Sequence, residues 1–177
     1  MMRKRILTIA SVVAAAAAFP AVAGATTTTN PANAPNGTHF KSGTASCSVN
    51  SSTGSVTCNG FTLAGVGNTN VTANLSANYS ATVVCINGGG NPSDSQHQGT
   101  FTKAATSGTL QPKNGNVTVP PLSTTAPTER EFLAQQTCPN PNWTPKLAGA
   151  ITLSSFTYTV QFVGFSGPYI TITGNDP

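Results

Sequence analysis

The 177-residue chain carries only eight basic and four acidic residues, so threonine, serine, asparagine and glycine must supply most of its polar surface. Three of the basic residues lie within the first five positions, and the rest of the chain holds five basic against four acidic residues, a net charge of +1. These five basic residues are scattered along the chain. Their distribution argues against a nucleic-acid-binding protein, which needs several clustered cations to displace counterions from phosphates.

The N-terminus has the order of segments found in a secretory signal peptide. A basic stretch from Arg3 to Arg5 precedes an uncharged, mostly apolar run from Ile6 to Phe19, and small residues then satisfy the cleavage rule. The apolar run is shorter than the roughly 20 residues that span a bilayer. We predict a signal peptide at residues 1–25, cleaved after Ala25 or, as the alternative, after Ala23. The mature protein is then secreted, extracellular and free of the membrane.

Residues 26–38 are rich in threonine, asparagine and proline and show no aliphatic periodicity. Such a composition buries too little apolar surface to fold on its own. We therefore predict a flexible tail at 26–38, followed by a single domain at 39–177.

Four cysteines in an exported chain predict two disulfides. The segment from Ser51 to Gly54 is typical of a hairpin turn, and that hairpin places Cys47 opposite Cys58 at a separation that a disulfide spans. Elimination then pairs Cys85 with Cys138. A zinc site is disfavoured because the cysteines include no C-x-x-C pair and both histidines lie apart. We expect no metal and no cofactor.

The clearest local pattern runs from Val71 to Cys85, where every second residue is apolar. A period of two predicts one half-buried strand, with Leu75 inside and Asn74 outside. At about 3.3 Å per residue this strand is longer than most, so we expect it to bend or to pass between sheets. The polar segment 87–98 predicts an exposed loop.

Turn signals divide the next part of the chain into short strands. Two are predicted at 99–106 and 109–111, on either side of Ser107-Gly108. Asn114-Gly115 is the strongest two-residue hairpin signal and predicts a turn into a strand at 117–119. The neighbouring prolines indicate a sheet edge.

The C-terminal third combines a helix signal with further strands. Thr128 and Glu131 form a capping-box pattern, which predicts a short helix at 129–136; an edge strand there stays open as the alternative. Strands are predicted at 147–153, 156–165 and 169–173. The apolar parity switches at Ser154-Ser155, which indicates a β-bulge or a tight connection.

Together these signals predict an all-β, antiparallel β-sandwich of about seven to nine strands with two disulfides. The Cys85-x-Asn87-x-Gly89-Gly90-Asn91 stretch, the Cys138-Pro139 turn that leads to Trp143 and the threonine-rich strands resemble small secreted bacterial β-sandwich proteins. Those proteins are immunoglobulin-like in shape and mostly of unknown function. The resemblance implies a fold and a compartment but no activity. In true immunoglobulin domains the inter-sheet disulfide brackets a core tryptophan on an early strand. Trp143 departs from this pattern, because it follows the last cysteine.

We predict no catalytic residues. Asp94 and His97 lie in one predicted loop near several serines, but Ser-His-Asp hydrolysis needs a nucleophile and a base that are held rigidly together. A secreted hydrolase using the 94–97 loop is therefore the least favoured alternative. Glu129 and Glu131 are explained as first-turn helix residues that oppose the helix dipole.

Carbohydrate binding is the main functional alternative. Trp143, Tyr158 and Tyr169 are the candidate ligand contacts, as exposed rings among many amides and hydroxyls. The competing interpretation buries both tyrosines in the core and places Trp143 at one end of the sandwich. We predict a secreted, non-catalytic module that acts by surface contact, with cell-envelope polysaccharide or another protein as its partner.

Overall fold

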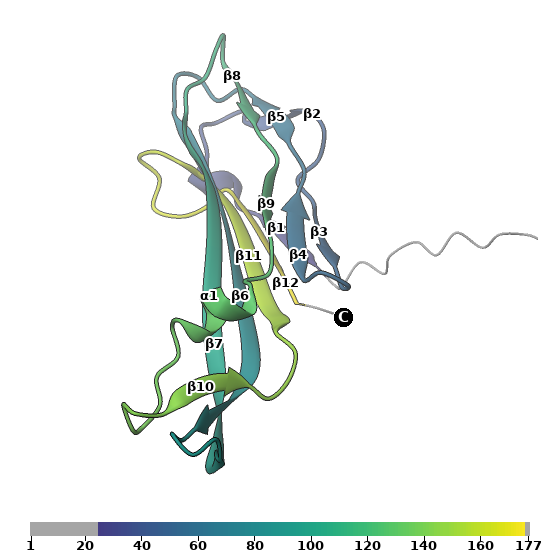
Figure 1. The fold of residues 1–177 in the computed structure, drawn as a ribbon. Coiled ribbons are helices and arrows are strands. Elements are labelled where there is room, and N and C mark those ends of the chain that lie inside the picture. Colours follow the sequence, from purple (N-terminus) through teal and green to yellow (C-terminus); the bar gives the residue numbers. More distant parts are fainter. Residues whose placement is uncertain (1–24, 176–177) are drawn as a thin grey trace, which may run out of the picture.

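The computed structural model describes residues 25–175, apart from the side chains of Asp94 and Ser95, and its strands form two layers (Figure 1). The larger layer is a sheet in the order β1 (Thr26–Thr29), β12 (Ile170–Gly174), β11 (Thr152–Phe162), β6 (Val71–Ile86) and β7 (Pro92–Leu110). β10 (Thr144–Leu147) pairs with the end of β6, beyond the stretch that pairs with β11. Every pair is antiparallel.

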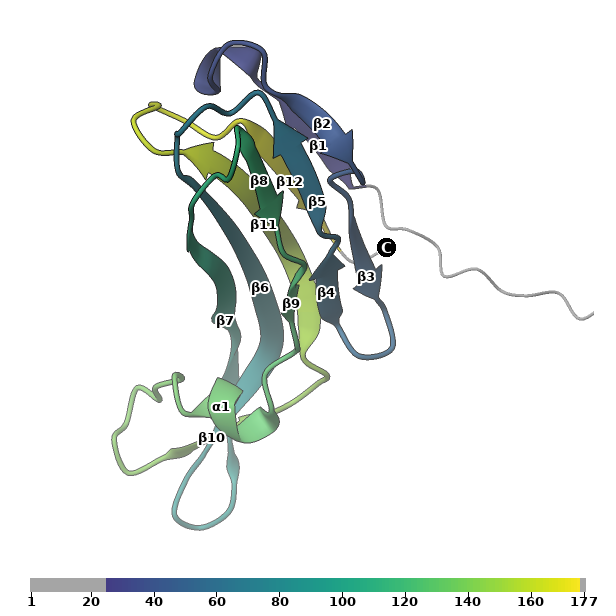
Figure 2. The ribbon, with the colours of Figure 1, turned by 90° about the horizontal axis from the view of Figure 1, so that it is seen from above.

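The smaller layer consists of two three-stranded sheets that continue one another (Figure 2). One contains β2 (His39–Ser42), β5 (Phe61–Ala64) and β8 (Asn116–Val119); the other contains β3 (Cys47–Asn50), β4 (Ser55–Cys58) and β9 (Leu122–Thr124). The ladder is interrupted at Asn59-Gly60 and at Pro120-Pro121. Proline has no N–H to donate, and a side chain on Gly60 would lie 3.0 Å from the Val119 carbonyl oxygen. The structure is thus an all-β sandwich, as predicted.

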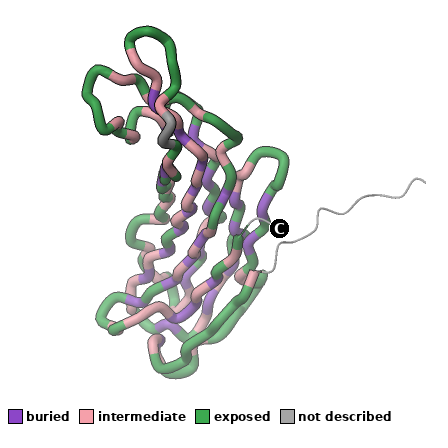
Figure 3. Tube along the Cα trace, turned by 90° about the horizontal axis from the view of Figure 1, so that it is seen from below, coloured by how far each residue is buried: buried purple, intermediate pink, exposed green. Residues whose placement is uncertain are grey.

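The core lies between the layers, and β6 runs through its centre. Leu75 is fully buried and Asn74 is exposed, which agrees with the period-two pattern. Figure 3 shows this alternation of buried and less buried positions along the larger sheet. β6 stays in that sheet over its whole length and does not pass between sheets. Tyr79 crosses the core, and its hydroxyl donates a 2.9 Å hydrogen bond to the Gly54 carbonyl oxygen in the opposite layer.

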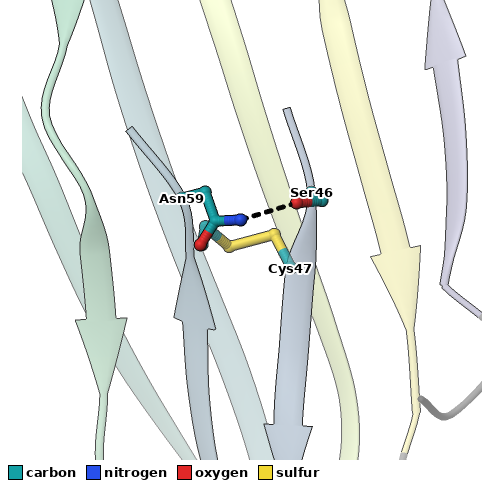
Figure 4. Close-up of a disulfide and its surroundings, with 4 residues drawn as sticks. Ser46, Cys47 and Asn59 are labelled. Atoms are coloured by element: carbon teal, nitrogen blue, oxygen red, sulfur yellow. Dashed lines mark hydrogen bonds between the residues drawn. A yellow bond between two sulfur atoms is a disulfide. The ribbon is translucent and has the colours of Figure 1, made fainter. Parts of the chain in front are cut away.

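Both predicted disulfides are present. Cys47 and Cys58 are directly opposed in the β3–β4 hairpin, in the predicted register. Beside this bridge, the Asn59 side-chain amide donates to the Ser46 hydroxyl at 2.9 Å (Figure 4). This disulfide therefore fastens the smaller layer near its interruption, whereas Cys85–Cys138 fastens the end of β6 to the segment that follows the helix.

The capping box at Thr128 and Glu131 starts a helix, α1 (Glu129–Leu133), so the helix and not the edge strand is confirmed. It ends three residues earlier than predicted. Its Phe132 is fully buried and stacks on Phe101 of β7, with 6.2 Å between ring centroids. α1 and β10 lie at one end of the sandwich (Figure 1).

The prediction of a flexible tail at 26–38 is wrong. Thr26–Thr29 forms β1, which pairs with β12, and a 3-10 turn at Pro31–Asn33 leads to the buried Ala34. The lack of aliphatic periodicity does not exclude a strand here, because an edge strand of β-branched threonines is held by backbone pairing. Residues 1–24 of the signal peptide predicted at 1–25 lie outside the described residues.

The prediction of an exposed loop at 87–98 is also wrong from Pro92 onward, because β7 begins there and continues to Leu110. The two strands predicted at 99–106 and 109–111 are parts of this one strand. Ser107-Gly108 forms a bulge in it, where the Ser107 hydroxyl accepts a 2.9 Å hydrogen bond from the Ala73 N–H. A side chain thus replaces the missing backbone partner.

Two further local predictions are confirmed and one is corrected. Asn114-Gly115 is the turn between β7 and β8, with both φ angles positive (51° and 70°), as a type I′ hairpin requires. Ser154 is a bulge, since Leu153 pairs with Tyr79 and Ser155 with Asn78. The strand predicted at 147–153 is wrong: β10 ends at Leu147, and the small residues after it turn the chain toward β11.

Candidate binding surfaces

The three predicted aromatic contacts do not form a joint platform. Tyr158 and Tyr169 are only 1% and 6% exposed, so both belong to the core and their prediction as surface rings is wrong. Tyr169 packs edge-on against Phe162, with 5.6 Å between ring centroids. Trp143 is half-buried just before β10, next to the end of β6, whereas Tyr158 lies opposite Leu75.

The residues of the hydrolase alternative lie on β7 and not in a loop. His97 is in register with Val83 and is half-buried, while the side chain of Asp94 is outside the described part. Glu131 accepts hydrogen bonds from the Thr128 N–H and from the Lys103 ammonium group, and these contacts lower the pKa of its carboxyl. Glu131 therefore serves the helix cap and an ion pair.

Among the described side chains of residues 25–175, which leave out that of Asp94, no three histidine, cysteine or acidic groups gather in a way that would hold a metal ion. The helices described there are also too short to cross a membrane.

The central part of the outward face of the larger sheet carries mostly small polar side chains. Strand registers align these side chains in rows that cross the five strands. One row is Thr26, Thr173, Thr157, Ser76 and Ala104, and the next is Thr28, Thr171, Thr159, Asn74 and Thr106. Adjacent strands of a sheet lie about 4.8 Å apart, and residues two positions apart on one strand are separated by about 6.7 Å. Neither row contains a charged residue or an aromatic ring.

Hydrogen bonds connect the side chains of a third row. The Asn78 amide nitrogen donates to the Ser155 hydroxyl at 3.2 Å, and the Thr102 hydroxyl donates to the Asn78 amide oxygen at 2.7 Å. These bonds hold the side chains in fixed orientations. We name the three rows together the threonine face.

A shallow pocket of about 420 Å³ on the smaller layer has different chemistry. It carries two lysines among hydroxyls and amides. Its lining residues are Lys41, Thr62, Leu110, Gln111, Lys113, Asn114, Asn116 and Thr118. Sequence analysis missed this pocket because its residues come from β2, β5, β7 and β8, and no spacing along the chain connects them.

Comparison with family models, curated proteins and solved structures gave no match to this chain. The structure itself defines the class: an antiparallel all-β sandwich with two disulfides.

Proposed function

We propose that this chain is an exported, non-catalytic module whose threonine face contacts a neutral, hydroxyl-rich polysaccharide of the cell envelope. The observation that carries the proposal is the alignment of Thr26, Thr173, Thr157 and Ser76 in one row, with a second row beside it. The immunoglobulin-like character inferred from the resemblance is part of the same proposal.

The chemistry of the face supports a polymer with repeated hydroxyl groups. Each threonine or serine hydroxyl donates one hydrogen bond and accepts others, and each asparagine does both through separate atoms. Threonine side chains are stiff at χ1, so little rotamer freedom remains to be lost on contact. Many weak contacts made at once give a stable attachment, because each later contact is intramolecular.

The absence of charge from the rows points to a neutral partner. A charged polymer would find no countercharge on the rows and would lose solvation on contact. A contact of this kind changes little with ionic strength, because salt screens charge pairs and not hydrogen bonds between neutral groups.

Export is supported by the N-terminal pattern and by the disulfides. Cys47–Cys58 and Cys85–Cys138 are the kind of bond that persists in oxidising compartments. Cleavage after Ala25 would leave Thr26, the first residue of β1, as the mature N-terminus.

Cosedimentation of the mature protein with a panel of insoluble neutral polysaccharides and cell-envelope fractions tests the proposal. We expect retention on at least one neutral polysaccharide, equal retention at low and high salt, and no release of soluble sugar. Failure to sediment with every member of the panel, retention that salt abolishes, or release of sugar would overturn it.

A further inference from the structure

We infer that the pocket between Lys41 and Lys113 binds the anionic group of an acidic glycan, a carboxylate or a phosphate carried on a polyhydroxylated chain. This site goes beyond the proposed function. It lies on the smaller layer, whereas the threonine face lies on the larger one, so the two faces bind independently.

Lys113 and Asn114 are held by the hairpin between β7 and β8. Asn114 and Gly115 have the positive φ angles of a two-residue turn, and Lys113 pairs with Asn116 across it. The Asn116 side-chain amide also donates to the Asn114 carbonyl oxygen at 2.8 Å. The backbone that presents Lys113 is therefore fixed before a ligand arrives.

Lys41 comes from a β-bulge in β2. The pairing shifts between Phe40 and Ser42, so that Lys41 and Ser42 together oppose Thr62 on β5. Bulges re-aim side chains in this way. The Thr62 hydroxyl lies 3.2 Å from the Thr118 hydroxyl on β8, and only one of the two can donate in that bond. The other hydroxyl hydrogen remains available for a ligand oxygen.

The electrostatics of the pocket favour an anion. Two of the five basic residues that follow the predicted signal peptide line this pocket, although they lie 72 positions apart in the sequence. In the described part of the chain, the one ion pair is that between Lys103 and Glu131, so neither pocket lysine has a carboxylate partner. Two ammonium groups that line one pocket repel each other, and an anion bound between them offsets that repulsion.

The remaining lining specifies what carries the anion. The amides of Gln111, Asn114 and Asn116 and the threonine hydroxyls can donate to and accept from sugar hydroxyls. Single-stranded nucleic acid is disfavoured, because its binding sites use aromatic rings for base stacking and no ring lines this pocket. A pocket of about 420 Å³ has the size of a small-ligand site, enough for one sugar unit.

Calorimetric titration of the whole mature protein tests the inference with four probes: an oligogalacturonate, a polyglycerol phosphate, a neutral oligosaccharide of matched length, and single-stranded DNA. We expect the wild type to bind the oligogalacturonate or the polyglycerol phosphate. Lys41→Gln and Lys113→Gln should each bind the same probe at least about tenfold more weakly. The acidic probe that binds identifies the anion. Lys146→Gln, an exposed lysine on β10, is the matched control and should bind like the wild type.

The inference is overturned if neither acidic glycan binds, if DNA binds more tightly than both, or if Lys146→Gln loses as much affinity as the pocket variants. Cosedimentation of the same variants with neutral polysaccharide separates this inference from the proposed function. Lys41→Gln and Lys113→Gln should sediment like the wild type, because neither lysine belongs to the threonine face. Reduced sedimentation of either variant would contradict the independence of the two faces.

Discussion

Thr159 of β11 lies directly opposite Thr171 of β12, and both side chains point away from the core. Their sequence neighbours Val160 and Ile170 are also paired with each other and are fully buried. One register therefore builds two surfaces at once, an apolar one that closes the sandwich and a polar one that faces solvent. A slip of one residue would exchange them.

Leu75 and Asn74 test this register on the central strand. Leu75→Ala should lower the free energy of unfolding by about 2–5 kcal/mol, because it removes buried contacts and leaves a cavity. Asn74→Ala should cost less than about 0.5 kcal/mol, since its side chain is exposed. Denaturant melts of the two variants measure both values. Equal losses would show that β6 is buried on both faces.

The two disulfides should contribute unequally to stability. Cys85 and Cys138 are 53 positions apart and Cys47 and Cys58 are 11 apart. Constraint of the unfolded chain then gives about 4 kcal/mol for the longer loop and about 3 kcal/mol for the shorter. Melts of the two paired Cys→Ala variants compare them. A larger loss without Cys47–Cys58 would mean that this bridge acts mainly by holding the interrupted smaller layer.

Tyr158 should make the protein sensitive to alkali. Burial raises the pKa of its hydroxyl to about 12, against 10.0 for a tyrosine in water. Between these pH values the unfolded chain loses a proton that the folded chain keeps, so the free energy of unfolding falls by about 1.4 kcal/mol per pH unit. Below pH 10 both states hold the proton and this contribution does not change.

The control for that prediction is Tyr158→Phe. Among the described residues, no group accepts a hydrogen bond from the Tyr158 hydroxyl, so its removal should leave stability at neutral pH unchanged or slightly higher. The loss between pH 10 and pH 12 should become smaller. It should not vanish, because burial also raises the pKa of Tyr79 and Tyr169. An alkaline melt identical to that of the wild type would contradict the account.

Local rules predicted the features whose causes lie close together in the sequence. The Cys47–Cys58 hairpin, the Asn114-Gly115 turn and the capping box at Thr128 each depend on a few adjacent residues. The alternation in β6 was equally visible, because its apolar residues all face one core.

The wrong predictions concern segments whose structure depends on backbone pairing with residues far away in the sequence. Thr26–Thr29 has no apolar pattern and becomes a strand because β12 offers it a free edge. Pro92–Gln98 looks like a loop and extends β7 because β6 continues far enough to pair with it. Both candidate surfaces depend on strand pairing between distant parts of the chain. Neither the threonine face nor the pocket between Lys41 and Lys113 could therefore be found from local sequence.

The mature N-terminus should be Thr26 or Gly24, since cleavage after Ala25 or Ala23 satisfies the small-residue rule. Both products retain all of β1. Intact mass of the protein recovered from culture medium decides between them. A recovered product that still carries Arg3 to Arg5 would contradict export by a cleaved signal peptide.

The most direct test of the central claim compares one substitution on each layer. Thr159→Lys places a long charged side chain on β11, the central strand of the threonine face, and Thr57→Lys places the same side chain on β4, where Thr57 is exposed on the smaller layer. Both variants should melt like the wild type. The measurement is the dissociation constant for the insoluble neutral polysaccharide. We predict that Thr159→Lys weakens binding by about tenfold or more and that Thr57→Lys leaves it unchanged. Equal binding by both variants would show that the threonine face is not the contact surface.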